Sequence, residues 1–197
     1  MKKSSRLLQL LMGLFLCLSL NVNLAAREIA DVKLIEQITV EAIDDILKLN
    51  GAGIRTKFFF KIYVGALYLP EKQNSAQAIL KSAKANRVLM HFLYDEVEKK
   101  KLVDAWVEGF EDNVDAKTFS ALKDRLNKFN QMFSDMHKGD VVLLDYIPGK
   151  GTRVMIKGDV KGTIEGDDFN RALLSVWLGE EPVTEALKDA MLGVEEE

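Results

Sequence analysis

Residues 49–70 read LNGAGIRTKFFFKIYVGALYLP, and the prediction of the fold begins there. From Phe58 to Leu69 this segment is apolar or aromatic at both alternating positions, interrupted by one charged residue, Lys61. A strand with one face in water alternates apolar and polar residues, so the pattern indicates a strand that is buried on both faces. We therefore expect residues 54–69 to form one long central strand.

Two glycines and an arginine precede that segment. Gly51 and Gly53 stand one residue apart, and glycine lets a backbone bend or approach a neighbouring element closely. Arg55 follows with no acidic residue nearby in the sequence. An arginine at the start of a strand is commonly solvated or paired with a distant carboxylate, and it is seldom buried without a partner. The alternative is that Arg55 faces inward and binds an external anion.

The whole pattern resembles the chalcone isomerase family, most closely its bacterial chalcone-isomerase-like branch. The resemblance rests on two features, namely the glycine turn that leads to Arg55 and a strand that ends in Tyr68 and Leu69. A second segment, IEGDDF at 164–169 through SVWLG at 175–179, resembles the C-terminal helix of the family. The resemblance covers nearly all of the chain after the first 26 residues. It implies an α+β fold in which an antiparallel β-sheet packs against a layer of α-helices, an open-faced sandwich with a ligand cleft between the layers.

The first residues are typical of an export signal. Basic residues at positions 2, 3 and 6 precede an apolar segment over residues 7–20, and Ala25 and Ala26 offer small side chains for cleavage. We predict a cleavable signal peptide over residues 1–26, a single domain over 27–197, and a periplasmic or secreted location; an uncleaved anchor is the alternative. The only cysteine, Cys17, lies in the apolar segment, so the cleaved chain would hold no disulfide.

The charge of the chain excludes one class of function. The full sequence has a formal net charge of −3, and removal of three basic residues with the signal would leave about −6. A surface for nucleic acid needs an excess of basic residues, so we exclude that class. Two histidines far apart and the single cysteine give no metal-ligand spacing, and no cofactor motif is present.

Periodicity predicts the elements around the central strand. His91 is expected on a sheet face of mixed character, with no assigned chemistry, and His137 is expected to close the second long helix. The predicted elements are short strands at 38–40 and 46–49, a helix capped by Ser75, a strand at 87–93, helices with apolar stripes at 102–110 and 119–136, a strand meander over 141–164 that turns at 148–151 and 158–159, and two final helices that start near Asp167 and Pro182.

The resemblance also suggests site residues. In the plant enzymes of the family the arginine of the glycine turn holds a substrate oxygen during ring closure, aided by a threonine, a tyrosine and an asparagine. Arg55 matches this arginine, whereas Tyr63 stands where the threonine is expected. Tyr94 lies in the region of the tyrosine, Asp104 near the asparagine, and Thr163 close to a last polar position. This departure from the pattern argues against flavonoid cyclisation.

The leading hypothesis is an exported protein that binds a fatty acid or a similar amphipathic carboxylate. The family includes non-catalytic members that bind fatty acids through an arginine and a tyrosine, so Arg55, Tyr63 and Tyr94 are the candidate ligand-binding residues. A guanidinium can hold a carboxylate through two parallel hydrogen bonds, and a phenol adds a third donor. Residues 58–60 and Leu67 would line an apolar tunnel for the rest of the ligand.

Two other functions stay open. The chain could be an isomerase or intramolecular lyase for an α,β-unsaturated carbonyl compound, with Arg55 stabilising developing oxyanion charge and Tyr63 or Tyr94 assisting proton transfer. It could instead be a non-catalytic assembly or structural factor of the cell envelope, in which case Arg55 would carry no function.

Overall fold

The structure is a computed structural model that describes residues 26–41 and 45–194. The predicted signal peptide, with Cys17, lies outside the described residues except for Ala26, the first residue of strand β1 (Ala26–Ile29). In the described part of the chain, every helix is too short or too polar to cross a membrane.

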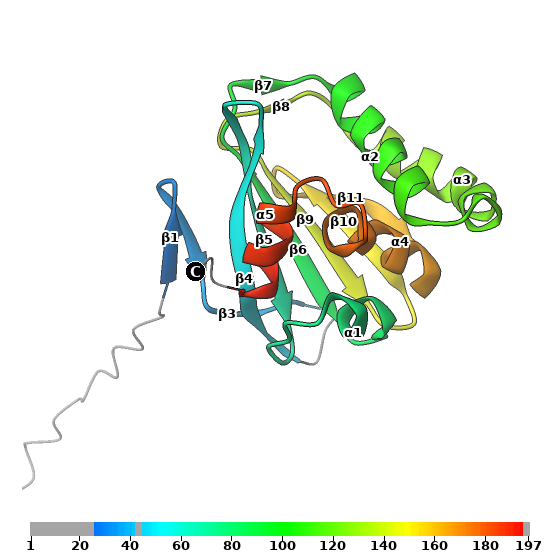
Figure 1. Cartoon of the computed structure of the whole chain (residues 1–197), viewed down its shortest axis with the longest axis horizontal. Coiled ribbons are helices and arrows are strands. Elements are labelled where there is room, and N and C mark those ends of the chain that lie inside the picture. The colour runs from blue at the N-terminus through cyan, green and yellow to red at the C-terminus, as the bar shows by residue number, and fades with distance from the viewer. Residues whose placement is uncertain (1–25, 42–44, 195–197) are drawn as a thin grey trace, which may run out of the picture.

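The centre of the fold is a seven-stranded antiparallel sheet in the order β11-β10-β9-β6-β5-β4-β3 (Figure 1). Its strands follow one another along the chain from β3 to β6, and β9 then adds to β6 and continues as a meander. The strands are β3 (Gln37–Thr39), β4 (Ile46–Lys57), β5 (Phe60–Leu69), β6 (Asn86–Phe92), β9 (Val141–Ile147), β10 (Gly151–Ile156) and β11 (Asp159–Ile164).

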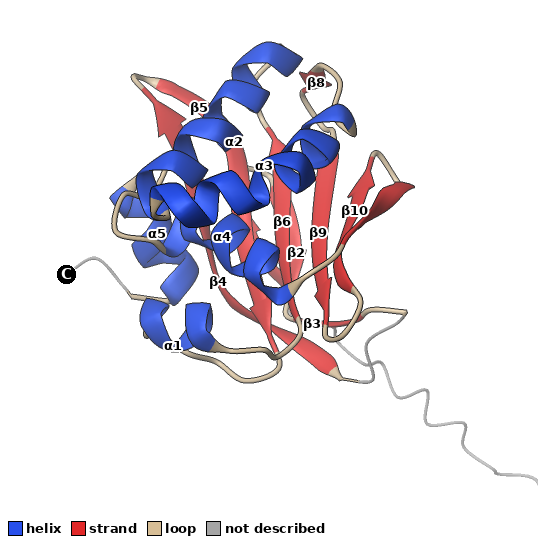
Figure 2. Ribbon diagram, turned by 90° about the vertical axis from the view of Figure 1, so that its right-hand side faces the viewer, coloured by secondary structure: helices blue, strands red, loops and turns tan. Residues whose placement is uncertain are grey.

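Helices cover one face of this sheet, as Figure 2 shows, which confirms the predicted α+β fold. The helices are α1 (Ala76–Lys81), α2 (Lys99–Asn113), α3 (Ala116–Gln131), α4 (Asp167–Leu178) and α5 (Glu185–Leu192). The main apolar core lies between the helices and the sheet. A second core, which includes Leu34, Leu47 and Tyr68, lies where the hairpin of β1 and β2 (Val32–Ile35) packs on the sheet.

The prediction of one continuous strand over residues 54–69 is wrong. Strands β4 and β5 pair down to Lys57 and Phe60, and Phe58 and Phe59 form the turn between them. The two turn side chains are 85% and 98% exposed, and Phe58 has φ of +56°. A two-residue hairpin turn normally contains glycine or asparagine at such an angle. An unbroken aromatic run gives no such signal, so periodicity alone could not locate the turn.

The sequence allowed either a bend or a close approach at the two glycines, and the structure shows a close approach. Helix α5 packs on β4 so tightly that a Cβ atom on Gly53 would lie 2.5 Å from Cβ of Ala190, and one on Gly51 would collide with the helix backbone. Asn50 fixes the same contact, because its Nδ2 donates a hydrogen bond of 2.8 Å to the carbonyl oxygen of Met191.

The second long helix ends earlier than predicted. Helix α3 stops at Gln131, although Phe133 and Met136 continue its apolar spacing and are buried in the same core. Phe133 and Met136 lie beyond the end of α3, but their spacing matches a helical period. The sequence pattern therefore placed them in the helix. Met136 and His137 instead form the short strand β8, which pairs with β7 (Glu96–Val97).

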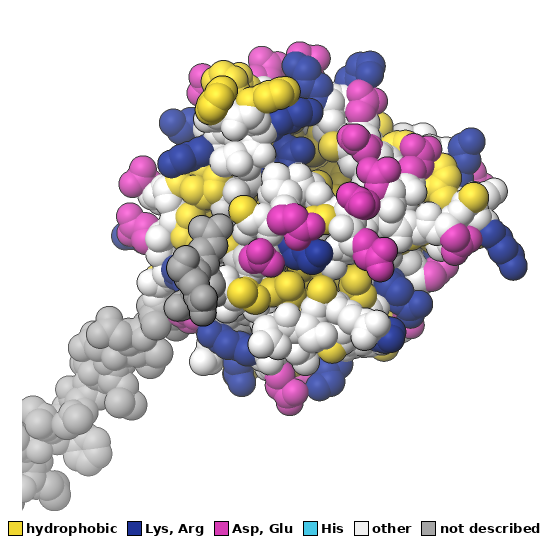
Figure 3. All heavy atoms as spheres, in the orientation of Figure 1, with side chains coloured by type: hydrophobic (Ala, Val, Ile, Leu, Met, Phe, Trp, Pro, Cys, Tyr) yellow, Lys and Arg dark blue, Asp and Glu magenta, His cyan; other side chains and the backbone are white. Residues whose placement is uncertain are grey.

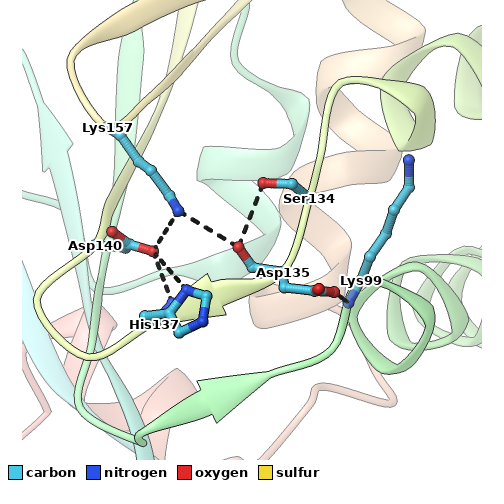
Figure 4. Close-up of polar contacts among 6 residues, drawn as sticks. All are labelled: Lys99, Ser134, Asp135, His137, Asp140 and Lys157. Carbon is cyan, nitrogen blue, oxygen red and sulfur yellow. Dashed lines mark hydrogen bonds and ion pairs between the residues drawn. The ribbon is translucent and has the colours of Figure 1, made fainter.

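His137 therefore closes no helix, and Figure 4 shows its surroundings. Its backbone N–H donates a hydrogen bond of 2.7 Å to Oδ2 of Asp140, and Nζ of Lys157 lies 2.8 Å from the same oxygen. Beside it, Oδ1 of Asp135 accepts a 2.7 Å hydrogen bond from the backbone N–H of Lys99 at the start of α2. The Asp135 contact holds the segment after α3 against the start of α2, and Lys157 joins the same segment to the end of β10.

The ends of the shorter helices are partly as predicted. Ser75 caps α1, since its Oγ accepts a hydrogen bond from the N–H of Ala78, as expected. Asp167 caps nothing: the cap of α4 is Gly166, and Asp167 accepts a hydrogen bond from the Tyr146 hydroxyl. Helix α5 starts not at Pro182 but at Glu185, after a cap by Thr184.

Candidate functional site

A cavity of about 320 Å³ opens between the β4–β5 end of the sheet and the first turns of α2. Its volume is at the lower end of the range of small-molecule sites, roughly 300–1,000 Å³. Most of its wall is apolar, and its charged side chains come from β4, the β6–α2 connection and the start of α2. The lining residues that matter below are Arg55, Tyr63, Phe92, Tyr94, Lys101 and Trp106.

The pairing of β4 with β5 brings the first two candidate residues together. Arg55 and Tyr63 are direct partners across the antiparallel pair, so their side chains share the face of the sheet that the helices cover. The register shifts beside them and leaves Ile62 as an extra residue of β5, so Ile62 and Tyr63 both line the cavity. The Arg55 guanidinium carbon lies 5.8 Å from the centre of the Tyr63 ring, within reach of a cation–π contact.

Arg55 differs from the other half-buried arginines. Arg87 and Arg153 both bind the buried carboxylate of Asp145, and Arg125 binds Asp168 through two hydrogen bonds. Among the residues that the structure describes, Arg55 has neither a carboxylate partner nor a hydrogen bond. Its half-buried charge faces the cavity, so an anion in the cavity is the partner that the arrangement lacks.

Tyr63 lies deeper in the cavity wall and is 4% exposed. Its hydroxyl oxygen accepts a hydrogen bond of 2.9 Å from Nε1 of Trp177 in α4. Burial raises the pKa of Tyr63, and this effect outweighs the opposing influence of Arg55 and of the Trp177 hydrogen bond. The phenol therefore keeps its proton, for which the described residues offer no acceptor, and it can donate that proton to a ligand oxygen.

Trp106 lines the cavity, and the sequence analysis did not predict it as a site residue. Its ring is 2% exposed, lines the cavity and lies 5.5 Å from the Trp177 ring in a T-shaped arrangement. Within the described part of the chain, its buried Nε1–H has no hydrogen-bond partner. The sequence placed Trp106 in an apolar helix stripe, which is correct for its ring but gives no sign of an unsatisfied donor. A buried donor without a partner is costly. Trp106 is part of the cavity wall, whereas its Nε1 atom is itself buried.

The outer part of the cavity carries the third candidate. Tyr94 lines the cavity at 37% exposure, with its ring 5.4 Å from that of Phe60. Lys101 also lines this part, and its Nζ lies 2.8 Å from Oε1 of Glu98. The structure thus brings Arg55, Tyr63 and Tyr94 to one cavity, with Tyr63 buried and Tyr94 partly exposed.

Other residues considered from the sequence lie elsewhere. Phe58 and Phe60 line the cavity as expected, but Phe59 points into solvent and Leu67 is buried in the core away from the cavity lining. Asp104 is exposed on α2 and pairs with Lys100, and Thr163 lies on the edge strand β11, so neither lines the cavity. His91 is half-buried on β6, and its burial lowers its pKa. Over residues 26–41 and 45–194, no cluster of side chains could hold a metal ion.

Comparison with known proteins agrees with the fold. The sequence matches the chalcone isomerase-like family over residues 26–193. No curated protein sequence matches the chain. Among solved structures, a fatty-acid binding protein of Arabidopsis thaliana has the same fold, with a TM-score of 0.66 over 85% of this chain and 96% of that protein. The two sequences are 14% identical, so the likeness concerns the fold.

Proposed function

The chain belongs to the chalcone isomerase-like family, and from this premise we propose that it binds a fatty acid or a similar amphipathic carboxylate in the cavity beside Arg55. The observation that carries the proposal is the half-buried guanidinium of Arg55, which faces an apolar cavity and has no carboxylate partner and no hydrogen bond among the described residues. A ligand carboxylate would supply the missing negative charge.

The donors around the cavity suit one carboxylate head group. Arg55 can offer two parallel N–H donors, and Tyr63 offers a hydroxyl proton that burial keeps in place. Each hydrogen bond to a charged group contributes about 1.5–3 kcal/mol.

The rest of the cavity suits a hydrocarbon chain. Ile62, Met90, Phe92, Leu102 and Val176 form its apolar wall. Burial of apolar ligand surface contributes about 25 cal/mol per Å², so a ligand that combines a carboxylate with an alkyl chain uses both parts of the site. The fatty-acid binding protein of Arabidopsis, which shares the fold, supports this choice of ligand.

The protonation of Tyr63 favours binding over the isomerase alternative. A base that removes a proton from an enone substrate works best when its pKa is near the working pH. Burial moves the pKa of Tyr63 upward, away from that range. Tyr63 is therefore better suited to donate a hydrogen bond than to accept a proton.

We also propose export, with cleavage near Ala26. The basic start, apolar core and small residues of the first 26 positions support it. N-terminal sequencing of the protein from a cell-envelope fraction tests this proposal directly. A chain that retains Met1 and stays in the cytoplasmic fraction would contradict it.

The binding proposal is tested by what the protein carries. Native mass spectrometry of the gently purified protein is expected to show a bound long-chain acid, and Arg55→Ala is expected to lose it. Arg171→Ala is the matched control, because it removes the same charge from an exposed helix position outside the cavity. An empty protein with no affinity for long-chain acids, or equal loss in both variants, would contradict the proposal.

A further inference from the structure

The turn between β4 and β5 exposes an unusual amount of aromatic surface. Phe58 is 85% exposed, Phe59 98% and Phe60 55%. We call residues 57–61, with these three rings between Lys57 and Lys61, the hairpin tip. Figure 3 shows hydrophobic side chains gathered at the end of the molecule where Figure 1 places this turn, with basic side chains beside them. Scattered apolar side chains are common on protein surfaces, but three consecutive phenylalanines at a projecting turn are a concentrated patch.

The backbone of the hairpin tip is strained at the residues that form this aromatic patch. Phe58 has φ of +56°, an angle that glycine or asparagine adopts readily and a bulky residue rarely does. Glycine would relieve the strain, and the packing of the fold does not require the phenylalanine, because its side chain lies mostly in solvent. Strain that serves no packing purpose is commonly retained for function.

The charges of the tip identify a suitable partner. Lys57 and Lys61 are both exposed, and neither forms an ion pair with any described residue. Aromatic rings flanked by unpaired lysines match the boundary of an anionic bilayer, where apolar groups enter the acyl region and ammonium groups meet lipid phosphates. A stable contact between proteins buries about 1,200–2,000 Å² in total, far more than the five residues of the hairpin tip can supply.

We propose that the hairpin tip inserts into the headgroup region of an anionic lipid bilayer. Phe58 and Phe60 also line the cavity, so insertion sets the opening of the cavity against the lipid surface. The contact goes beyond the proposed carboxylate binding and does not depend on it.

Depth of insertion is measured at the tip itself. Phe59→Trp places a fluorophore at the turn, while the native Trp106 and Trp177 are buried and give a constant background. The probe is a vesicle of phosphatidylcholine and phosphatidylglycerol. We expect a blue-shifted emission and quenching by brominated lipid acyl chains, relative to the unsubstituted chain. This readout reports the position of the tip even if the apolar N-terminal segment also binds vesicles.

Variants then separate the apolar and the charged contributions. Phe58→Ser with Phe59→Ser is expected to weaken partition into these vesicles at least about tenfold. Lys57→Gln and Lys61→Gln are each expected to weaken it about fivefold at low salt, with little effect on vesicles of phosphatidylcholine alone. The matched controls are Ile46→Ser, roughly 35 Å away along β4 at about 3.3 Å per residue, and Lys150→Gln in a turn at the opposite end of the sheet. Both controls are expected to bind as the unsubstituted chain does.

The variant Phe58→Gly tests whether weaker vesicle binding could result from loss of folding. It is expected to keep or raise the melting temperature, because it relieves the positive φ, while vesicle binding falls. Three results would overturn the proposal: tip variants that bind vesicles as tightly as the controls, a Phe59→Trp emission that vesicles neither shift nor quench, or self-association in solution that the double serine variant abolishes. The last result would make the tip a contact between copies of the chain.

Discussion

At the scale of single residues, the central feature is a charge without a partner. Among residues 26–41 and 45–194, three half-buried arginines pair with aspartates, and Arg55 faces an apolar cavity. The sequence indicated that Arg55 had no acidic neighbour along the chain. Residues far apart in the sequence can still pair, as Arg87 and Asp145 do across 58 positions. Only the structure shows that, among the described residues, Arg55 has no such distant carboxylate partner.

Tyr63 has a structural role in addition to the binding role that we propose for it. Tyr63→Phe removes the acceptor of the buried Trp177 Nε1–H, so we expect it to lower the free energy of unfolding by about 1–3 kcal/mol. Chemical denaturation measures the loss. Tyr94→Phe is the control, because the Tyr94 hydroxyl makes no hydrogen bond within the described part of the chain. Equal stability of the two variants would show that the Tyr63–Trp177 bond does not stabilise the fold.

At the scale of elements, the glycines of β4 fix the position of α5. Gly53→Ala places a methyl group 2.5 Å from Cβ of Ala190, and overpacking of this kind costs about 1–3 kcal/mol. We expect the free energy of unfolding to fall by that amount in chemical denaturation. Ala190→Gly removes the atom that the new methyl group meets, so the cost of Gly53→Ala should shrink in that background. An unchanged cost would mean that the strain arises elsewhere.

The same elements show how far sequence reasoning reaches. Residues that carry a physical signal were placed correctly: Ser75 as a helix cap, the glycine pair as a close contact, and the meander after residue 141. The Phe58–Phe59 turn was missed because its conformation contradicts the local preference of phenylalanine and is imposed by the pairing of β4 with β5. The end of α3 was missed because burial in the core continues beyond the helix.

The candidate site, like the fold, was predicted only in part. Arg55 and Tyr63 follow from the resemblance of one segment, and strand pairing places them side by side. Trp106 and Trp177 come from helices far along the chain, and the polar roles of their N–H groups depend on a packing that no local pattern encodes.

At the scale of the whole molecule, two buried tyrosines make the free energy of unfolding depend on alkaline pH. Burial raises the pKa of Tyr68 to about 12, and burial with the hydrogen bond to Asp167 raises that of Tyr146 to about 12. In the unfolded chain a tyrosine ionises near pH 10. Because the pKa of each tyrosine is higher in the folded state than in the unfolded chain, its protonated form stabilises the folded state. This contribution is complete below about pH 10 and is lost as the pH rises to about 12.

We therefore expect the free energy of unfolding to fall between about pH 10 and pH 12, together with the rise of tyrosinate absorbance. Tyr146→Phe is expected to make the decline shallower, which separates the tyrosine contribution from that of the lysines that lose their charge in the same range. A curve with the same slope in both proteins would contradict the assignment.

The most direct test of the account compares two ligands that share one alkyl chain, a long-chain fatty acid and the corresponding alcohol, by calorimetric titration of the lipid-free protein. The charge-assisted hydrogen bonds that we propose for Arg55 are worth about 1.5–3 kcal/mol each, so even one of them makes the acid bind roughly 10- to 150-fold more tightly than the alcohol, and Arg55→Ala should abolish this preference. A preference for the acid that survives Arg55→Ala, or binding of neither ligand to the unsubstituted protein, would contradict the claim that Arg55 holds a carboxylate.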